Sequence, residues 1–123
     1  MESGKLEMLR QVASGIATQF GSSCEVVIHD LSKHPDHSIV HIVNGHVSGR
    51  KVGDGASKVV IEQLSTNDPA PKDHLSYLMK TPDGKILKSS SMYIRDAEGN
   101  ICAIFCINYD ISALTMAEDA IRS

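Results

Sequence analysis

The seven consecutive apolar residues from Ile101 to Ile107 (ICAIFCI) constrain the fold of this chain more than any other segment. Side chains of a strand alternate between the two faces of its sheet, and here both faces are apolar. Such a strand belongs in the middle of a sheet that is covered on both sides. The run therefore predicts a central strand with other elements packed above and below it.

The C-terminal half predicts three strands joined by short turns. The strands are His74–Thr81, Ile86–Arg95 and Ile101–Asp110, and the turns between them are Asp83-Gly84 and residues 97–100 (AEGN). Gly and Asn accept the backbone conformations that tight hairpins require. The three strands should therefore be antiparallel neighbours.

The N-terminal part predicts a helix followed by two further strands. Residues 5–20 carry apolar side chains at steps of three and four, and Gly21 ends the pattern. The residues of this apolar stripe are Leu6, Leu9, Ala13, Ile16 and Phe20. The strands are Cys24–Leu31 and Ile39–Val43, and the short turn around Pro35 between them suggests a hairpin.

The remaining segments predict loops and two short helices. Residues 44–57 hold four of the nine glycines and read as a loop with at most short helical turns. Lys58–Leu64 fits a helix with Val60, Ile61 and Leu64 on one side, and residues 65–73 break it. A last helix, 112–122, would be capped by Ser112.

The order of elements gives an α+β fold with an antiparallel sheet of about five strands. We expect one domain over residues 1–123, with an N-terminal helix 5–20, a core 24–110 and a C-terminal helix 112–122. The middle segment can cover one face of the sheet, but the N-terminal stripe is small for the other. We therefore expect a homodimer with that helix and the sheet at the contact. The alternative is that both terminal helices cover the face within one chain.

Composition limits the classes of partner. The net charge of -3 and the pI near 6.0 argue against this chain gripping nucleic acid by itself. The longest apolar run is far shorter than the roughly 20 residues of a membrane helix, and no signal peptide is visible. Three cysteines without a CxxC pattern suit buried free thiols in a reducing compartment. These features predict a soluble cytoplasmic domain.

The six histidines do not form a recognised metal motif, because none has HExxH or zinc-finger spacing. His34 and His37 lie in a polar turn, where solvation is the simpler interpretation. His29 and His41 lie on the first two strands and could face each other across the hairpin. A zinc site made by these two and a cysteine is the open alternative to no metal.

No nucleophile has a catalytic pattern. The segment GHVSG (residues 45–49) places its serine one position late for a nucleophile elbow. Cys102 and Cys106 are four apart in a strand, so they should share one apolar face and be inert. Neither a dinucleotide-binding nor a phosphate-binding glycine loop occurs. We therefore predict no catalytic residue, and a small enzyme with His29 or His46 as base is the weaker alternative.

Polar residues interrupt the apolar strands at a few places. Ser89, Ser90 and Ser91 lie in the middle of one strand, and Asn108 and Asp110 share a face at the end of another. The glycine-rich loop offers further polar groups, namely Asn44, His46, Ser48 and Arg50. Together these could line a small polar cavity. They could equally hydrogen-bond to one another and anchor the loop, and both interpretations can hold together.

Three segments of the chain carry a resemblance to a known family. They are CEVVIHDL (24–31), HSIVHIVNGHVSGRKVGD (37–54) and LKSSSMYIRDAEGNICAIFCINYD (87–110). In sequence and order they resemble the YheO-like PAS domain family, the N-terminal domains of bacterial transcription regulators with a C-terminal helix-turn-helix. The likeness extends over about residues 8–114.

The resemblance implies a PAS-like five-stranded antiparallel sheet with helices packed on it. It also implies a sensory role that couples a ligand or partner to dimeric DNA binding. It supplies no catalytic residues and no settled ligand. Candidate ligand-binding residues carried over from it are Asn44, Gly45, His46, Gly49, Arg50, Ser89, Ser90, Asn108 and Asp110.

From these candidates we expect a small polar metabolite as ligand. Arg50 would pair with a carboxylate, while Asp110 or Asn108 would hold an amine or amide, which favours an amino-acid-like molecule. Residues 111–122 would transmit the ligand-dependent change. No cofactor is expected, because a haem-attachment C-x-x-C-H is absent and aromatics are too few to stack a flavin.

The chain stops at Ser123, where the family would continue into its DNA-binding part. We therefore expect either an isolated sensory domain or an excised one, with DNA contacted only through a helix-turn-helix domain absent from this chain. The alternative function is a ligand-free dimerisation or protein-interaction module.

Overall fold

A computed structural model describes residues 1–64 and 71–123, and its elements follow the predicted order. The predicted break at 65–73 falls mostly outside the described residues. The elements are α1 (Ser3–Phe20), β1 (Cys24–Asp30), the 3-10 turn η1 (Pro35–His37), β2 (Ile39–Val43), the 3-10 turn η2 (Gly45–Val47), α2 (Lys58–Leu64), β3 (His74–Lys80), β4 (Ile86–Arg95), β5 (Ile101–Asp110) and α3 (Ser112–Arg122).

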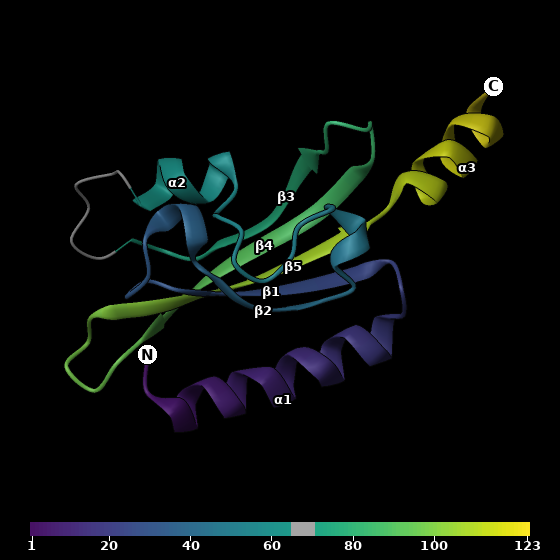
Figure 1. The fold of residues 1–123 in the computed structure, drawn as a ribbon. Coiled ribbons are helices and arrows are strands. Elements are labelled where there is room, and N and C mark those ends of the chain that lie inside the picture. Colours follow the sequence, from purple (N-terminus) through teal and green to yellow (C-terminus); the bar gives the residue numbers. More distant parts are fainter. Residues whose placement is uncertain (65–70) are drawn as a thin grey trace.

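The strands form one antiparallel sheet in the order β2-β1-β5-β4-β3 (Figure 1). The apolar strand β5 is thus the central one, as its sequence predicts. Both C-terminal hairpins are present, and Gly84 and Gly99 adopt the positive φ angles of 90° and 86° that their turns require. The α+β class with a five-stranded sheet is confirmed.

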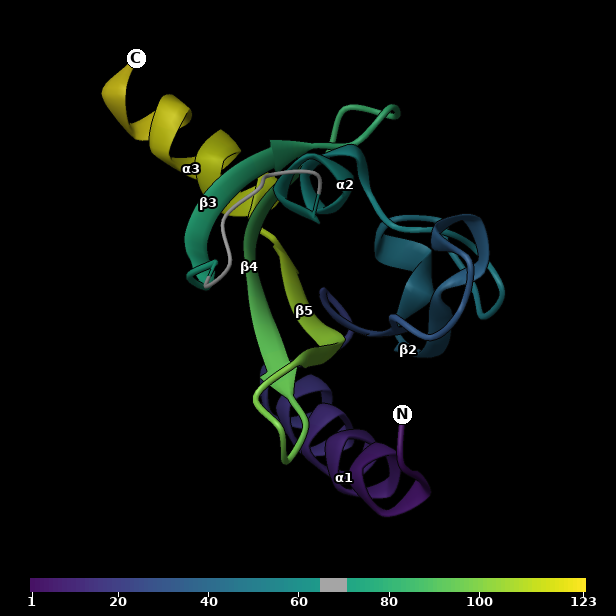
Figure 2. The ribbon, with the colours of Figure 1, turned by 90° about the vertical axis from the view of Figure 1, so that its left-hand side faces the viewer.

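The two faces of the sheet are covered by different parts of the chain (Figure 2). We call the face under α1 the outer face. Leu9, Ala13 and Ala17 of α1 are buried there against apolar residues of β1 and β5. The two alanines are small enough for the helix to lie close to the strands. Phe20, predicted to be part of this stripe, is 56% exposed and contacts the Tyr109 ring instead.

We call the opposite face, covered by α2 and the loop after β2, the inner face. Val60 of α2 is 2% exposed and packs there with Val27 and Ile104. Ile61 is 44% exposed, so the prediction that it shares the packed side of α2 with Val60 was wrong. The side chain of Leu64 lies outside the described residues.

Helix α3 extends away from the end of β5 (Figure 1), and none of its residues is buried. The alternative in which both terminal helices cover the outer face is therefore not realised. Ser112 is the first residue of α3 rather than its cap. Asp110 acts at this helix start, because its Oδ1 accepts hydrogen bonds from Ser112 N at 2.9 Å and Ser112 Oγ at 2.6 Å.

Bulges in three strand pairings change which face some side chains occupy, and two of them affect residues discussed above. Each adds one residue to a strand and so reverses the alternation beyond it. At the first, Ile28 pairs with His41 and His29 pairs with Ile39. The prediction that His29 and His41 could face each other across the hairpin was therefore wrong. At the second, near Arg95, Cys102 packs with the outer cluster while Cys106 lies in the inner one. The prediction that these two cysteines share a face was wrong.

Among the helices formed by the described residues, none combines the length and the apolar character needed to cross a bilayer.

Candidate functional site

A row of polar side chains runs across the inner face of the sheet. Glu25 of β1 is paired in register with Asn108 of β5, Asn108 with Ser89 of β4, and Ser89 with Tyr77 of β3. Directly opposite residues of neighbouring strands have Cβ atoms about 5 Å apart, so the four side chains form a continuous line. Ser91, two residues further along β4, is on the same face as Ser89, and its Oγ lies 3.0 Å from the Tyr77 hydroxyl.

Glu25 is the centre of a hydrogen-bond network and is fully buried, with 0% exposure. Its Oε2 accepts hydrogen bonds from Ser48 N at 3.0 Å and Ser48 Oγ at 2.5 Å. Its Oε1 accepts one from Asn108 Nδ2 at 2.8 Å and lies 3.6 Å from Arg50 Nη2. The carboxylate therefore ties β1, β5 and the loop after β2 together.

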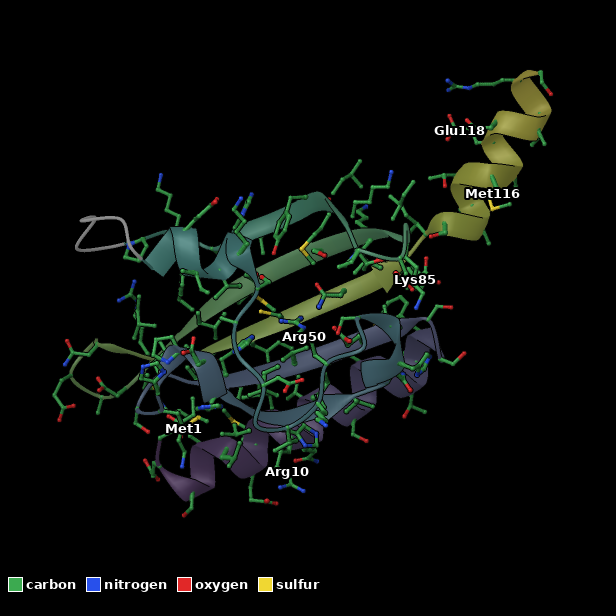
Figure 3. The ribbon with its side chains drawn as sticks, turned by 45° about the horizontal axis from the view of Figure 1, so that its top comes forward. Met1, Arg10, Arg50, Lys85, Met116 and Glu118 are labelled. Atoms are coloured by element: carbon green, nitrogen blue, oxygen red, sulfur yellow. The ribbon has the colours of Figure 1, made fainter. Side chains whose placement is uncertain are left out.

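Arg50 reaches from that loop over the strands, as Figure 3 shows. Its backbone N and its Nε both donate to Ser48 Oγ at 3.2 Å, which fixes the start of the side chain. The backbone approaches closely here, since a Cβ added to Gly45 would stand 2.5 Å from the Arg50 carbonyl oxygen. Gly45 is therefore required for the tight turn that delivers Arg50. The Arg50 side chain is 20% exposed, so the guanidinium remains within reach of a small molecule.

Three buried polar atoms on the inner face have no hydrogen-bond partner among the described residues. They are His29 Nε2, Arg50 Nη1 and Ser89 Oγ. Buried polar groups are nearly always satisfied, and leaving one unpaired costs about 1–3 kcal/mol. All three lie on the inner face, so this is the face on which a polar ligand would gain hydrogen bonds.

The inner face also perturbs titratable groups. Burial, with the Arg50 charge as a second cause, lowers the pKa of His29 to about 4. The His29 ring is therefore neutral at physiological pH, and its Nδ1 lies 2.8 Å from Ser38 Oγ. Burial raises the pKa of the Cys106 thiol to about 11, so this cysteine is not a nucleophile.

Two separate cavities open beside two of these residues, Arg50 and His29. One of about 490 Å³ is lined in part by Ser48 and Arg50. The other, of about 240 Å³, is lined in part by His29, Ser38 and Val60. The larger volume lies within the range of about 300–1,000 Å³ typical of small-molecule sites.

The structure brings three of the candidate residues predicted from the sequence together on the inner face, namely Arg50, Ser89 and Asn108. Glu25, which joins them, was not among the predicted residues. The available signal was an acidic residue directly before the apolar run 26–28 of the first strand. Asn44 lies at the start of the same loop, and its Nδ2 donates to the carbonyl oxygens of Gly21 and Cys24 at 3.3 and 2.8 Å. Asn44 therefore anchors the start of the loop and does not line the cavity beside Arg50.

The other candidates lie elsewhere. Ser90 lies on the outer face, where its Oγ accepts a hydrogen bond from Ser76 N at 2.9 Å. Asp110 is engaged at the start of α3. His46 is exposed, and so is Gly49, whose φ of 79° identifies it as a turn residue. Across residues 1–64 and 71–123, no group of three His, Cys, Asp or Glu side chains is arranged to hold a metal ion.

Comparison with known proteins places these features in context. The YheO-like PAS domain family matches residues 1–123. The chain is 34% identical over 116 residues to the transcriptional regulator DauR of Pseudomonas aeruginosa. The aligned region covers 94% of this chain and 52% of that protein. The chain is 29% identical over 107 residues to the uncharacterized protein YheO of Escherichia coli, covering 86% of this chain and 44% of that protein. The chain thus spans about half the length of these relatives.

Solved structures share the fold. The blue-light photoreceptor Aureochrome1 LOV in its dark structure superposes with a TM-score of 0.52 at 18% identity, covering 90% of this chain and 91% of that one. The PAS domain of the fruit-fly ELK potassium channel gives 0.52 at 15% identity, covering 80% and 96%. Identity this low supports the fold alone. The match of the family model over residues 1–123 shows that the chain belongs to the YheO-like PAS domain family.

Proposed function

We propose that this chain is the sensory domain of a bacterial transcription regulator and binds a small polar metabolite on its inner face without transforming it. The observation that carries the proposal is the set of three buried, unpaired polar atoms contributed by His29, Arg50 and Ser89. The family match and the relative DauR, named a transcriptional regulator, support the regulatory setting.

The ligand would place a carboxylate against Arg50, whose planar guanidinium is suited to that group. Ser89 Oγ and His29 Nε2 would supply further hydrogen bonds. The sequence also suggested an amine held by Asn108 or Asp110. Both side chains already have partners, Glu25 and Ser112 respectively, so the carboxylate contact is the part of that prediction with structural support.

Strand β5 offers a route from the ligand to the rest of the protein. Asn108 lies in the polar row, and Asp110, two residues later, holds the first residue of α3. A ligand that binds one arrangement of the inner face better than another would bias the position of α3. We propose that this bias reaches a DNA-binding part of the regulator through a cytoplasmic homodimer.

A thermal-shift screen of amino acids and small organic acids tests the ligand. A ligand present at about 100 times its Kd should stabilise the domain by roughly 2.7 kcal/mol. Arg50→Ala should abolish the shift, while Arg10→Ala, on the exposed surface of α1, should keep it. If no compound stabilises the protein, the ligand-free interaction module becomes the better account.

The dimer is tested separately by sedimentation equilibrium at high micromolar concentration. Met8, Val12 and Phe20 expose apolar side chains on α1, with exposures of 55%, 47% and 56%. We expect a dimer that Val12→Glu dissociates. A monomeric wild-type protein at that concentration would remove the dimer from the proposal.

A further inference from the structure

We propose that the cavity of about 240 Å³ beside His29 is a second binding site, which takes a small neutral molecule with one hydroxyl or N–H donor on an apolar body. The inference refines the proposed function at one point. His29 Nε2 receives a ligand of its own, while Arg50 and Ser89 remain with the polar metabolite.

This cavity is separate from the one beside Arg50. Among the described residues, the two cavities have no lining residue in common. His29 lies four residues after Glu25 on β1, which places it roughly 13 Å further along the strand. A small molecule in contact with His29 therefore does not depend on the network around Glu25.

His29 supplies a hydrogen-bonding atom whose partner is missing. Its side chain is fully buried, and its Nε2 has no partner among the described residues. Its Nδ1 lies 2.8 Å from Ser38 Oγ, which in turn lies 3.4 Å from the Pro35 carbonyl oxygen. A hydroxyl has one proton, so both contacts are hydrogen bonds only when Nδ1–H donates to Ser38 and Ser38 donates to Pro35. Nε2 then carries a lone pair, and the group that it lacks is a donor.

The rest of the lining favours an uncharged molecule. Its apolar residues are Leu31, Pro35, Ala56 and Val60. Lys33, the charged residue of the described lining, is exposed at the surface. The His29 ring is neutral, because burial lowers its pKa to about 4. An ion at the buried end would lose its hydration without meeting an opposite charge.

Water fits this cavity poorly. A buried water makes about three hydrogen bonds, whereas His29 Nε2 is the unpaired side-chain atom here and Ser38 Oγ is already engaged. Apolar cavities of about 150 Å³ in protein interiors stay dry and bind benzene. The cavity beside His29 is larger, so it has room for a ring of that size with a polar substituent.

The backbone holds the walls of the cavity in place. Ala56 N donates to the Pro35 carbonyl oxygen at 3.2 Å, and Gly53 N donates to that of Ile39 at 2.9 Å. A Cβ added to Gly55 would stand 2.8 Å from the Pro35 carbonyl oxygen, so this loop packs tightly against η1. Fixed walls reduce the conformational cost of binding.

Isothermal titration calorimetry of the 123-residue chain at pH 7 tests the inference. The probes are phenol and indole, each compared with the methylated form that lacks its donor, namely anisole and 1-methylindole. We expect phenol or indole to bind at least about tenfold more tightly than its methylated form, because the methylated molecule leaves His29 Nε2 unpaired.

Two variants locate the site. His29→Phe removes the acceptor, so each probe should then bind no more tightly than its methylated form. Ala56→Leu fills part of the cavity and should weaken binding of the donor probe by about tenfold or more. Ala117→Leu is the matched control, since it makes the same change on the exposed surface of α3 and should leave the affinity unchanged.

Three results would overturn the inference: failure of both phenol and indole to bind, equal binding of each probe and its methylated form, or undiminished binding to Ala56→Leu. Each of these would leave the proposed sensory function standing, because that function is decided by the thermal shift that requires Arg50.

Discussion

Replacing Glu25 should destabilise the domain more than replacing any exposed acidic residue. The carboxylate is fully buried and accepts hydrogen bonds from two groups of Ser48 and from Asn108, with Arg50 3.6 Å away. Glu25→Leu removes all of these acceptors at once. It leaves Arg50 mostly buried without its nearest anion, and it leaves the donors of Ser48 and Asn108 unpaired.

The expected magnitude follows from those contacts. Breaking a buried ion pair by removing one partner costs about 3–5 kcal/mol. Because the Arg50 side chain is 20% exposed and can keep some hydration, the lower end, about 3 kcal/mol, is expected for Glu25→Leu. Glu25→Gln keeps one acceptor oxygen, so it should cost about 1–2 kcal/mol. For a domain whose total stability is about 5–15 kcal/mol, both losses are readily measurable.

Urea denaturation followed by circular dichroism measures these free energies of unfolding. Glu7→Gln is the matched control, because its side chain is 76% exposed on α1 and should change stability by less than about 0.5 kcal/mol. A double-mutant cycle with Arg50→Met should give a coupling energy of about 1–3 kcal/mol between Glu25 and Arg50. If Glu25→Leu costs no more than the control, Glu25 does not organise the inner face and the account of the site is wrong.

Three further predictions test other parts of the structure. The pKa of His29 falls from 6.5 to about 4 on folding, so its contribution to stability is full above pH 6.5 and lost as the pH falls toward 4. Between pH 7 and 4, the free energy of unfolding measured by urea denaturation should therefore fall by about 3 kcal/mol more for wild type than for His29→Gln. Gly45→Ala should destabilise the domain by about 1–3 kcal/mol, since the new Cβ would stand 2.5 Å from a backbone oxygen. Gly15→Ala, whose Cβ would contact no atom within 4 Å, should stabilise it by about 0.5–1 kcal/mol. Thermal denaturation should therefore show a lower Tm for Gly45→Ala and a higher Tm for Gly15→Ala. Cys106, with its pKa raised to about 11, should resist alkylation at pH 8 in the native state, and labelling of Cys106 as fast as of the partly exposed Cys102 would contradict its burial.

The sequence predicted the sheet because its strands carry strong local signals. The apolar run of β5 has two buried faces only in a central position, and the Asp83-Gly84 and 97–100 turns leave little choice of pairing. The ends of α1 and α3 also follow from local residues. These features depend on neighbours in the chain, which is the information that a single sequence contains.

Side-chain direction near the bulges could not be predicted in the same way. A bulge depends on how two strands pair, and its one extra residue reverses the alternation, which separated Cys102 from Cys106. His29 and His41 were separated by the register itself, which places His41 opposite Ile28.

The same limitation applies to the site. Ser89 and Ser90 are adjacent hydroxyls with equal sequence signals, and only the register with Asn108 shows that Ser89 faces inward. Glu25 was missed because its partners, Ser48 and Asn108, are distant in sequence.

The most direct test of the central claim is a backbone NMR titration of the 123-residue domain with the compound that gives the largest thermal shift. The account predicts that the largest amide shift changes map to Ser48, Arg50 and Ser89 on the inner face, followed by the first turn of α3, and that Arg50→Ala removes them. Changes confined to α1 and the outer face, or the same changes in Arg50→Ala, would contradict it.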